Sequence, residues 1–113
     1  MQFPVDVGGV QVYAGDTVTL ISARVLEDDG VTPTDLSDWS NWRAGWRVNV
    51  ESEDVLALAV SVAGEQVSVT ASPAVSREIA GRRGVFDVEA TDTNGVVRTW
   101  FRGVTLSRLD VVR

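Results

Sequence analysis

The clearest pattern in this sequence is an alternation of apolar and polar residues, interrupted by turn-forming residues. Residues 42–50 place tryptophan, alanine or valine at every second position, mostly with arginine or asparagine between them. Residues 56–62, 67–71 and 86–90 alternate in the same way. A period of two is typical of a strand with one buried face, so these segments predict a sheet that packs over a core.

Two longer strands depart from strict alternation. In residues 17–26 the apolar phase slips between Leu20 and Ile21, which predicts a β-bulge or a stretch buried on both faces. Residues 96–106 form the return strand of a hairpin that turns at an Asn-Gly pair. Gly103 interrupts this strand, so we expect a bulge or the close approach of another segment there.

The two ends of the chain carry weaker strand signals. Residues 3–7 are extended, the glycines at 8–9 break the segment, and residues 10–13 and 109–112 are candidates for short extra strands. We expect residues 1–9 to form an extended arm that adds to the sheet edge of a neighbouring subunit or fills a groove on it.

One segment, at about residues 73–80, predicts a short helix. Ser72 is suited to cap its amides, Pro73 suits the first helical position, and Gly81 suits a left-handed stop. Two apolar side chains four residues apart would hold the helix against the sheet: Val75 and Ile79.

These elements predict one all-β domain across residues 1–113. Seven or eight strands with turns every eight to twelve residues indicate an antiparallel β-sandwich of the Ig-like, Greek-key type, with the helix as its only helical element. A helix through Trp39, Trp42 and Trp46 is the alternative, because these residues are three and four apart. Gly45 and the alternation that follows it favour a strand.

Composition argues against most kinds of chemistry. Among the 113 residues there is no cysteine, histidine or lysine. Disulfides, thiolate nucleophiles, zinc–sulfur sites, histidine bases and Schiff bases are therefore excluded. We expect no enzyme, no catalytic residues, no metal and no cofactor. The net charge of −6 and the scattered arginines argue against nucleic acid. No apolar run is long enough to cross a membrane.

Several residues are candidates for a binding, metal or catalytic site. Trp42 and Trp46 share a face with Ala44, so core packing is favoured over a platform for sugar rings. The acidic residues around the turn after the first long strand match no calcium-loop spacing, so solvated turns are favoured: Glu27, Asp28, Asp29, Asp35 and Asp38. Asp87 and Glu89 resemble a glycosidase pair, but acids on an exposed strand face are the common case.

The remaining candidates are for a protein interface. Trp100 falls in the polar phase of its strand between two arginines, so we expect an exposed contact with a protein or a glycan. An arginine pair after the helix is suited either to a partner's carboxylates or to a solvated turn. The interface candidates are Phe3, Val5, Val7, Arg82, Arg83, Arg98, Trp100 and Arg102.

The turn and strand motifs of this chain occur in an order that resembles a known family. In sequence these motifs are Gly-Asp-Thr at 15–17, Asp-Leu-Ser-Asp-Trp at 35–39, Arg-Ala-Gly-Trp-Arg at 43–47, the helical turn at 72–81, Gly-Val-Phe-Asp-Val at 84–88, Asn-Gly at 94–95, Gly103, and Asp-Val-Val-Arg at 110–113. In this order they resemble the small β-sandwich modules of tailed-phage tail and baseplate proteins, such as the N-terminal domain of upper-baseplate proteins. The family has glycine where this chain has Asp38, and a shorter aromatic segment than that around Trp42.

This resemblance implies a non-enzymatic structural protein of a virion, assembled in the host cytoplasm. It would be a minor tail or baseplate subunit that docks on other virion proteins, in a homo-oligomer or symmetric assembly. A capsid decoration protein is the first alternative. The second is a carbohydrate-binding module for the host cell wall, in which Trp100 would contact the glycan.

Overall fold

The computed structural model describes residues 4–26, 29–32, 34–49 and 51–106, which form an all-β fold with one short helix. This confirms the predicted class. The elements in chain order are β1 (Val5–Val10), β2 (Val18–Arg24), β3 (Ser40–Arg47), β4 (Leu56–Ala63), β5 (Gln66–Ala71), α1 (Pro73–Ile79), β6 (Gly84–Thr91) and β7 (Val97–Thr105).

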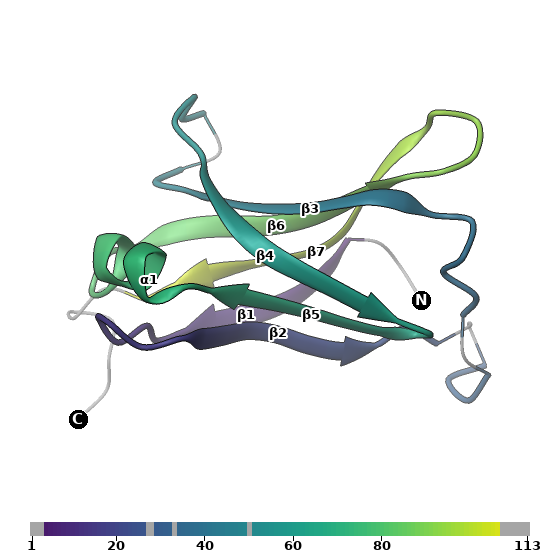
Figure 1. Cartoon of the computed structure of the whole chain (residues 1–113), viewed down its shortest axis with the longest axis horizontal. Helices are drawn as coiled ribbons and strands as arrows, with labels where there is room; N and C mark the ends of the chain where they lie inside the picture. Colours follow the sequence, from purple (N-terminus) through teal and green to yellow (C-terminus); the bar gives the residue numbers. More distant parts are fainter. Residues whose placement is uncertain (1–3, 27–28, 33, 50, 107–113) are drawn as a thin grey trace.

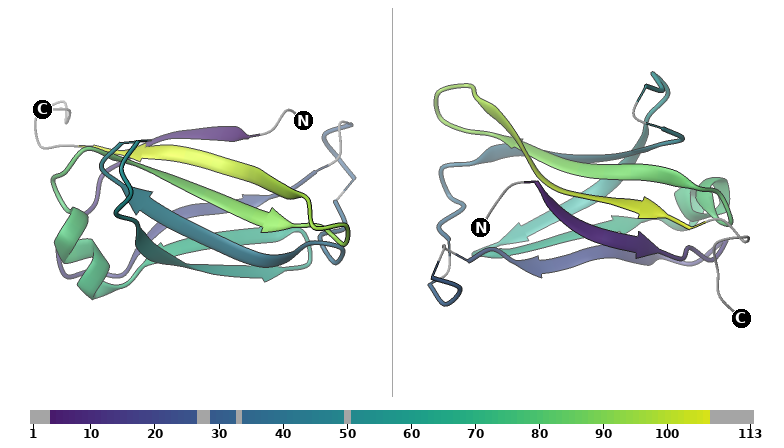
Figure 2. Two further views of the ribbon diagram at one scale, coloured as in Figure 1. Left: turned by 90° about the horizontal axis from the view of Figure 1, so that it is seen from above. Right: turned by 180° about the vertical axis from the view of Figure 1, so that it is seen from behind.

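The seven strands form one sheet in the order β1-β7-β6-β3-β4-β5-β2, and the sheet curls until it is nearly closed into a barrel (Figures 1 and 2). All neighbouring pairs are antiparallel except β1 and β7, which are parallel. The prediction of a wholly antiparallel fold is therefore wrong at this pair. The chain reaches β7 only after forming every other strand, so no hairpin joins the two.

Strand β4 belongs to both halves of the curled sheet. Its residues 56–58 pair with β3, and its residues 59–63 pair with β5. In Figure 1 it runs diagonally between the four strands β1, β7, β6 and β3 and the two strands β5 and β2. The core lies between these halves, and the inward positions of β5 and β6 predicted from alternation are buried: Val67, Val69, Ala71, Phe86, Val88 and Ala90.

Two β-bulges place adjacent side chains in the core. In β2 the register shifts between Thr19 and Ile21, and both Leu20 and Ile21 are buried, as predicted from the phase slip. In β7 the shift falls opposite Val88 and Glu89, so that Trp100 is the extra residue beside Phe101. A bulge turns the extra side chain away from its expected phase. Trp100 is 1% exposed, and the prediction that it is exposed is wrong.

Gly103 is a site of close approach, as predicted. A Cβ atom at this position would lie 2.5 Å from Phe86 Cζ, 2.8 Å from Val7 Cγ2 and 3.0 Å from the Gly8 carbonyl oxygen. Only glycine therefore allows β1 and β6 to pack at this distance against β7.

The N-terminal segment belongs to the chain's own sheet. Residues 5–10 form β1 on the edge of β7, so these residues are not a free arm. Gly8 and Gly9 do not end the strand. They form only a local irregularity in it, where Gly8 adopts φ +81° and donates its N–H to Asp6 Oδ1 (2.9 Å). The strand predicted at 10–13 is absent beyond Val10. Phe3 and residues 109–112 lie outside the described residues.

Strand β3 is shifted toward the N-terminus of its predicted range. It begins at Ser40 and ends at Arg47, so Val48 is 48% exposed rather than inward-facing. A turn begins at Asn49, whose side-chain oxygen accepts the Glu51 N–H (2.9 Å). This turn ends the alternation that the sequence continues to residue 50.

Helix α1 has the predicted signals at both ends. Ser72 Oγ accepts the Val75 N–H (3.3 Å), and Gly81 adopts φ +71° just after the helix. Ile79 is fully buried against the core. The buried Ser76 hydroxyl accepts the Gly15 N–H (3.0 Å), which ties the helix to the β1–β2 connection.

Candidate binding surface

The outward side of β1, β7, β6 and β3 carries most of the paired charges, and we call it the charged face. Cross-strand register places Asp6, Arg102 and Asp87 in one row across β1, β7 and β6. Arg43 opposes Glu89 in the neighbouring row. Opposite charges at directly opposed positions stabilise a sheet and mark the outer side of this half of the barrel.

The ion pairs on this face differ in quality. Arg43 Nε lies 2.8 Å from Glu89 Oε1, while Arg47 Nη2 lies 3.7 Å from Asp87 Oδ2. The second distance is too long for a charge-assisted hydrogen bond. Arg102 is exposed and forms no ion pair within 4 Å among residues 4–26, 29–32, 34–49 and 51–106. Two guanidinium groups therefore keep hydrogen-bonding capacity toward a ligand.

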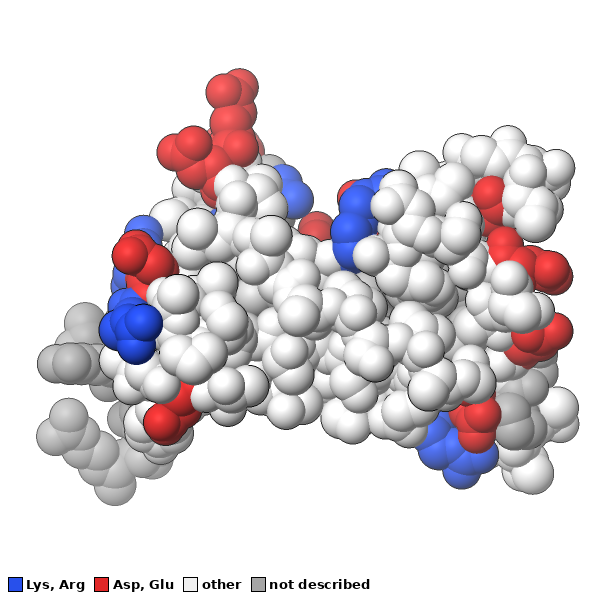
Figure 3. Space-filling view, viewed as in Figure 1, with Lys and Arg blue, Asp and Glu red and all other residues white. Residues whose placement is uncertain are grey.

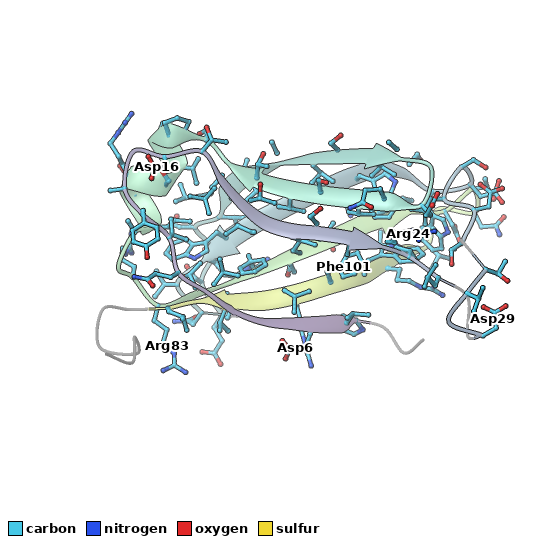
Figure 4. The ribbon with its side chains drawn as sticks, turned by 90° about the horizontal axis from the view of Figure 1, so that it is seen from below. Asp6, Asp16, Arg24, Asp29, Arg83 and Phe101 are labelled. Atoms are coloured by element: carbon cyan, nitrogen blue, oxygen red, sulfur yellow. The ribbon has the colours of Figure 1, made fainter. Side chains whose placement is uncertain are left out.

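A hollow of about 480 Å³ lies on the charged face between these two arginines. Its walls combine aliphatic side chains with both signs of charge: Pro4, Asp6, Arg47, Val85, Phe86, Asp87, Thr99, Arg102, Gly103 and Val104. Asp6, one of these residues, points outward from β1 (Figure 4). Arginine beside apolar surface is typical of protein interfaces.

Partial burial raises the pKa of the Asp87 carboxyl above its usual range. The neighbouring Glu89 charge acts in the same direction, and Arg47 opposes both. Asp87 lies beside Arg47 and Glu89 beside Arg43, so each carboxylate of this pair has an arginine neighbour on the outward side of the sheet. The arrangement is suited to holding charged groups of a partner.

The tryptophans fill the two ends of the barrel. At the end nearest the β6–β7 hairpin, the rings of Trp39 and Trp100 meet edge to face at 5.0 Å, and Trp42 lies 5.5 Å from Trp100. The Arg98 guanidinium covers this group, 5.1 Å from Trp39 and 5.2 Å from Trp100. A buried Trp100 has no ring face to offer a glycan.

Trp46 closes the opposite end, beside α1. Its Nε1–H donates to Thr105 Oγ1 (2.9 Å), and the Thr105 hydroxyl donates to the Arg82 carbonyl (2.8 Å). The Arg82 guanidinium lies 5.1 Å from the indole centroid. Trp46 is buried and Trp42 half-buried against the core, which confirms core packing for both.

The structure does not bring the predicted interface residues together. Arg102 is on the charged face, Arg98 covers the tryptophan group, and Arg82 and Arg83 follow the helix. Figure 4 shows Arg83 pointing away from the barrel. Val5 and Val7 pack half-buried against the core. Phe3 is outside the described residues. Arg47 is not among the predicted candidates, and Asp87 is considered only beside Glu89, because only the register of β3 against β6 brings Arg47 close to Asp87.

The acidic turn residues form local hydrogen bonds. Asp29 accepts the Val31 and Thr32 N–H groups (both 2.8 Å), and Asp35 accepts that of Ser37 (2.9 Å). The Thr32 hydroxyl and these amides lower the pKa of Asp29. Glu27 and Asp28 lie outside the described residues. In the described ranges, no three acidic residues are grouped to hold a metal.

Comparison with known proteins adds no relative. No family model, curated protein or solved structure matches this chain. Within the part of the chain that the structure describes, no helix is long and apolar enough to span a membrane. The geometry of the charged face therefore carries the functional argument.

Proposed function

We propose that this chain is a non-enzymatic structural subunit of a tailed-phage particle, a minor tail or baseplate component that docks on neighbouring virion proteins through its charged face. The order of turn and strand motifs supports the class of protein. The observation that carries the docking role is the hollow between Arg47 and Arg102, where guanidinium groups with unused donors stand beside Val85 and Val104.

The chemistry of the hollow favours a protein partner that presents a carboxylate next to an apolar side chain. Arg102 would bind the carboxylate, since no described acid lies within 4 Å of its guanidinium. The valines and Pro4 would cover the apolar group. A site with two arginines and two aspartates is close to neutral, so geometry rather than net attraction would select the partner.

The proposal includes the two-layer sandwich expected from the sequence. It is supported by β4, which passes from pairing with β3 to pairing with β5 and so divides the sheet into two packed halves. The Greek-key order is supported by β2 and β5 lying together at one end of the sheet order while β6 and β7 lie toward the other.

The test is incorporation into particles. A phage lacking this gene is complemented with the wild-type protein or with Arg102→Glu, and purified particles are analysed by quantitative mass spectrometry. We expect the wild type to be incorporated and Arg102→Glu to be reduced at least about tenfold, since reversing an interface charge costs a few kcal/mol.

The matched control is Arg77→Glu, an exposed arginine on α1 and not on the charged face. It changes the net charge equally and should be incorporated normally. Absence of the wild-type protein from particles would refute the virion proposal. Normal incorporation of Arg102→Glu would refute the charged face as the docking surface.

A further inference from the structure

The sheet has an unpaired edge on β2. Among the described strands, β2 pairs only with β5. The Val25 N–H donates to the Glu65 carbonyl (2.8 Å), and the Val25 carbonyl accepts the Thr34 N–H (2.8 Å), so the regular ladder ends at this residue. The backbone groups of successive residues point to opposite sides of a strand, so the Ala23 N–H, like that of Val25, is directed to β5, while Ser22 and Arg24 direct their backbone groups to the open edge.

The two edges of the sheet differ in how well they are protected. β1 carries Asp6, the positive-φ Gly8 and a register shift, all of which discourage a further strand. The last part of β2 is regular after its bulge at Leu20. It contains no proline, and its one charged residue, Arg24, is engaged by Glu65 on the adjoining turn (3.1 Å). β2 is thus the edge open to pairing.

The surface next to this edge is almost free of charge, in a chain whose net charge is −6. Figure 3 shows an uncharged band across the face formed by β4, β5 and β2. The side chains on its outward positions are small, and cross-strand register aligns Ser22, Ser68 and Ser61 in one row. Two copies can therefore meet here without bringing acidic groups together.

We propose that two copies of this chain pair edge to edge through β2, antiparallel and about a twofold axis. The axis passes between the two Ala23 residues. Ser22 of each copy then opposes Arg24 of the other as a hydrogen-bonded pair, which gives four backbone hydrogen bonds across the axis. A free edge strand is self-complementary in this arrangement, so one surface serves both copies.

In this register Arg24 faces the Ser22 hydroxyl of the second copy, and no like charges are directly opposed. The two three-stranded faces join into one continuous surface of mainly serine, threonine and alanine, with Arg24 and Gln66 at the end of each ladder. The pairing uses a surface distinct from the charged face. A test that refutes docking through the charged face would therefore leave the pairing through β2 unaffected, and the reverse also holds.

Cysteine cross-linking tests the register, because the natural chain has no cysteine. In Ala23→Cys the two thiols would belong to a non-hydrogen-bonded pair with Cα atoms about 4.5 Å apart, within disulfide range. The control is Ser61→Cys, an exposed outward position two strands from the edge. We expect Ala23→Cys to form disulfide dimers on the order of tenfold faster, since docking raises the effective thiol concentration to millimolar levels.

The mass of the wild-type protein in solution is the second measurement. Light scattering on a size-exclusion column should show a concentration-dependent species of twice 12.2 kDa. Ser22→Pro lacks the amide that points to the open edge and keeps the ladder to β5, so it should stay folded and monomeric. A wild type that is monomeric at every concentration, or equal cross-linking of the two cysteine variants, would overturn the proposal.

Discussion

Thr105 occupies a position where the alternation along β7 calls for an apolar side chain. Its hydroxyl is fully buried, yet it is satisfied on both sides, by the Trp46 Nε1–H and by the Arg82 carbonyl. The side chain therefore joins the end of β3, the turn before β6 and the end of β7 in one hydrogen-bonded chain. Buried polar groups that are fully paired in this way specify a single packing arrangement.

Thr105→Val should lower the free energy of unfolding by about 1–3 kcal/mol, because the Trp46 donor and the Arg82 acceptor lose their partner in a buried site. Urea unfolding measures the change. Thr99→Val, on the outer side of the same strand, is the control and should change the value by less than about 0.5 kcal/mol. Equal effects would show that the buried hydrogen bonds contribute nothing specific.

Asp87 should make stability depend on pH in a direction opposite to that of Asp29. Burial raises the pKa of folded Asp87, so the folded state holds this proton more tightly than the unfolded state. Its contribution is present at low pH and is lost as pH rises from about 3.9, the ordinary aspartate pKa, through the raised value. Asp29 has a lowered pKa, so its contribution is lost as pH falls.

Unfolding free energies of Asp87→Asn and the wild type, measured from pH 3 to 7, check this assignment. The unfolding free energy of the wild type minus that of Asp87→Asn should fall with rising pH. The unfolding free energy of the wild type minus that of Asp29→Asn should rise with rising pH. The same slope for both variants would contradict the assigned shifts.

At the residue scale, alternation predicted which side chains of β5 and β6 are buried, since inward and outward positions follow directly from the period. It failed at Trp100. The adjacent apolar pair Leu20 and Ile21 predicts a phase slip, and Trp100 beside Phe101 is an adjacent apolar pair of the same kind. The exposed arginines on either side, Arg98 and Arg102, make this part of the strand look polar, although the Arg98 guanidinium lies over the Trp100 ring.

At the scale of elements, helix α1 was predicted with its boundaries because its signals are local. Ser72 caps the amides of the next turn, and Gly81 provides the left-handed residue at the end. The Asn-Gly hairpin was predictable for the same reason. The pairing of β1 was not, because its partner β7 lies about ninety residues further along the chain.

Replacing Val5 and Val7 by serine should destabilise the protein by about 1–3 kcal/mol, since both side chains pack half-buried against the core. The matched control replaces Val96 and Val97, which are 58% and 51% exposed, and should cost under about 1 kcal/mol. Thermal unfolding followed by circular dichroism measures both. Equal losses would indicate that β1 adds nothing to the fold as a paired strand.

At the scale of the whole molecule, the tryptophans lie at the two ends of one core, so their fluorescence is sensitive to unfolding at either end. Trp46 lies beside α1, and the group around Trp100 lies at the opposite end, with the buried residues of β5 and β6 between them. Unfolding should therefore be a single cooperative transition. Tryptophan fluorescence and far-ultraviolet circular dichroism should give the same urea midpoint, and separate midpoints would show two independent units.

The closure of the sheet is the part of the fold that alternation could not predict. Period and turns give the number of strands, but their order depends on pairing between distant segments. β4 pairs with both β3 and β5, so it joins the two halves of the sheet along one side of the nearly closed barrel. The hollow on the charged face depends equally on that order, because its walls come from β1, β7, β6 and β3.

The parallel pairing of β1 and β7 has a mechanical consequence. The first strand begins and the last strand ends at opposite ends of the molecule, because the two run side by side in the same direction (Figure 2). Tension applied through the chain's two ends would slide these strands lengthwise, loading their backbone bonds simultaneously rather than peeling them one by one. A protein held at both ends under strain would resist extension through this pair first.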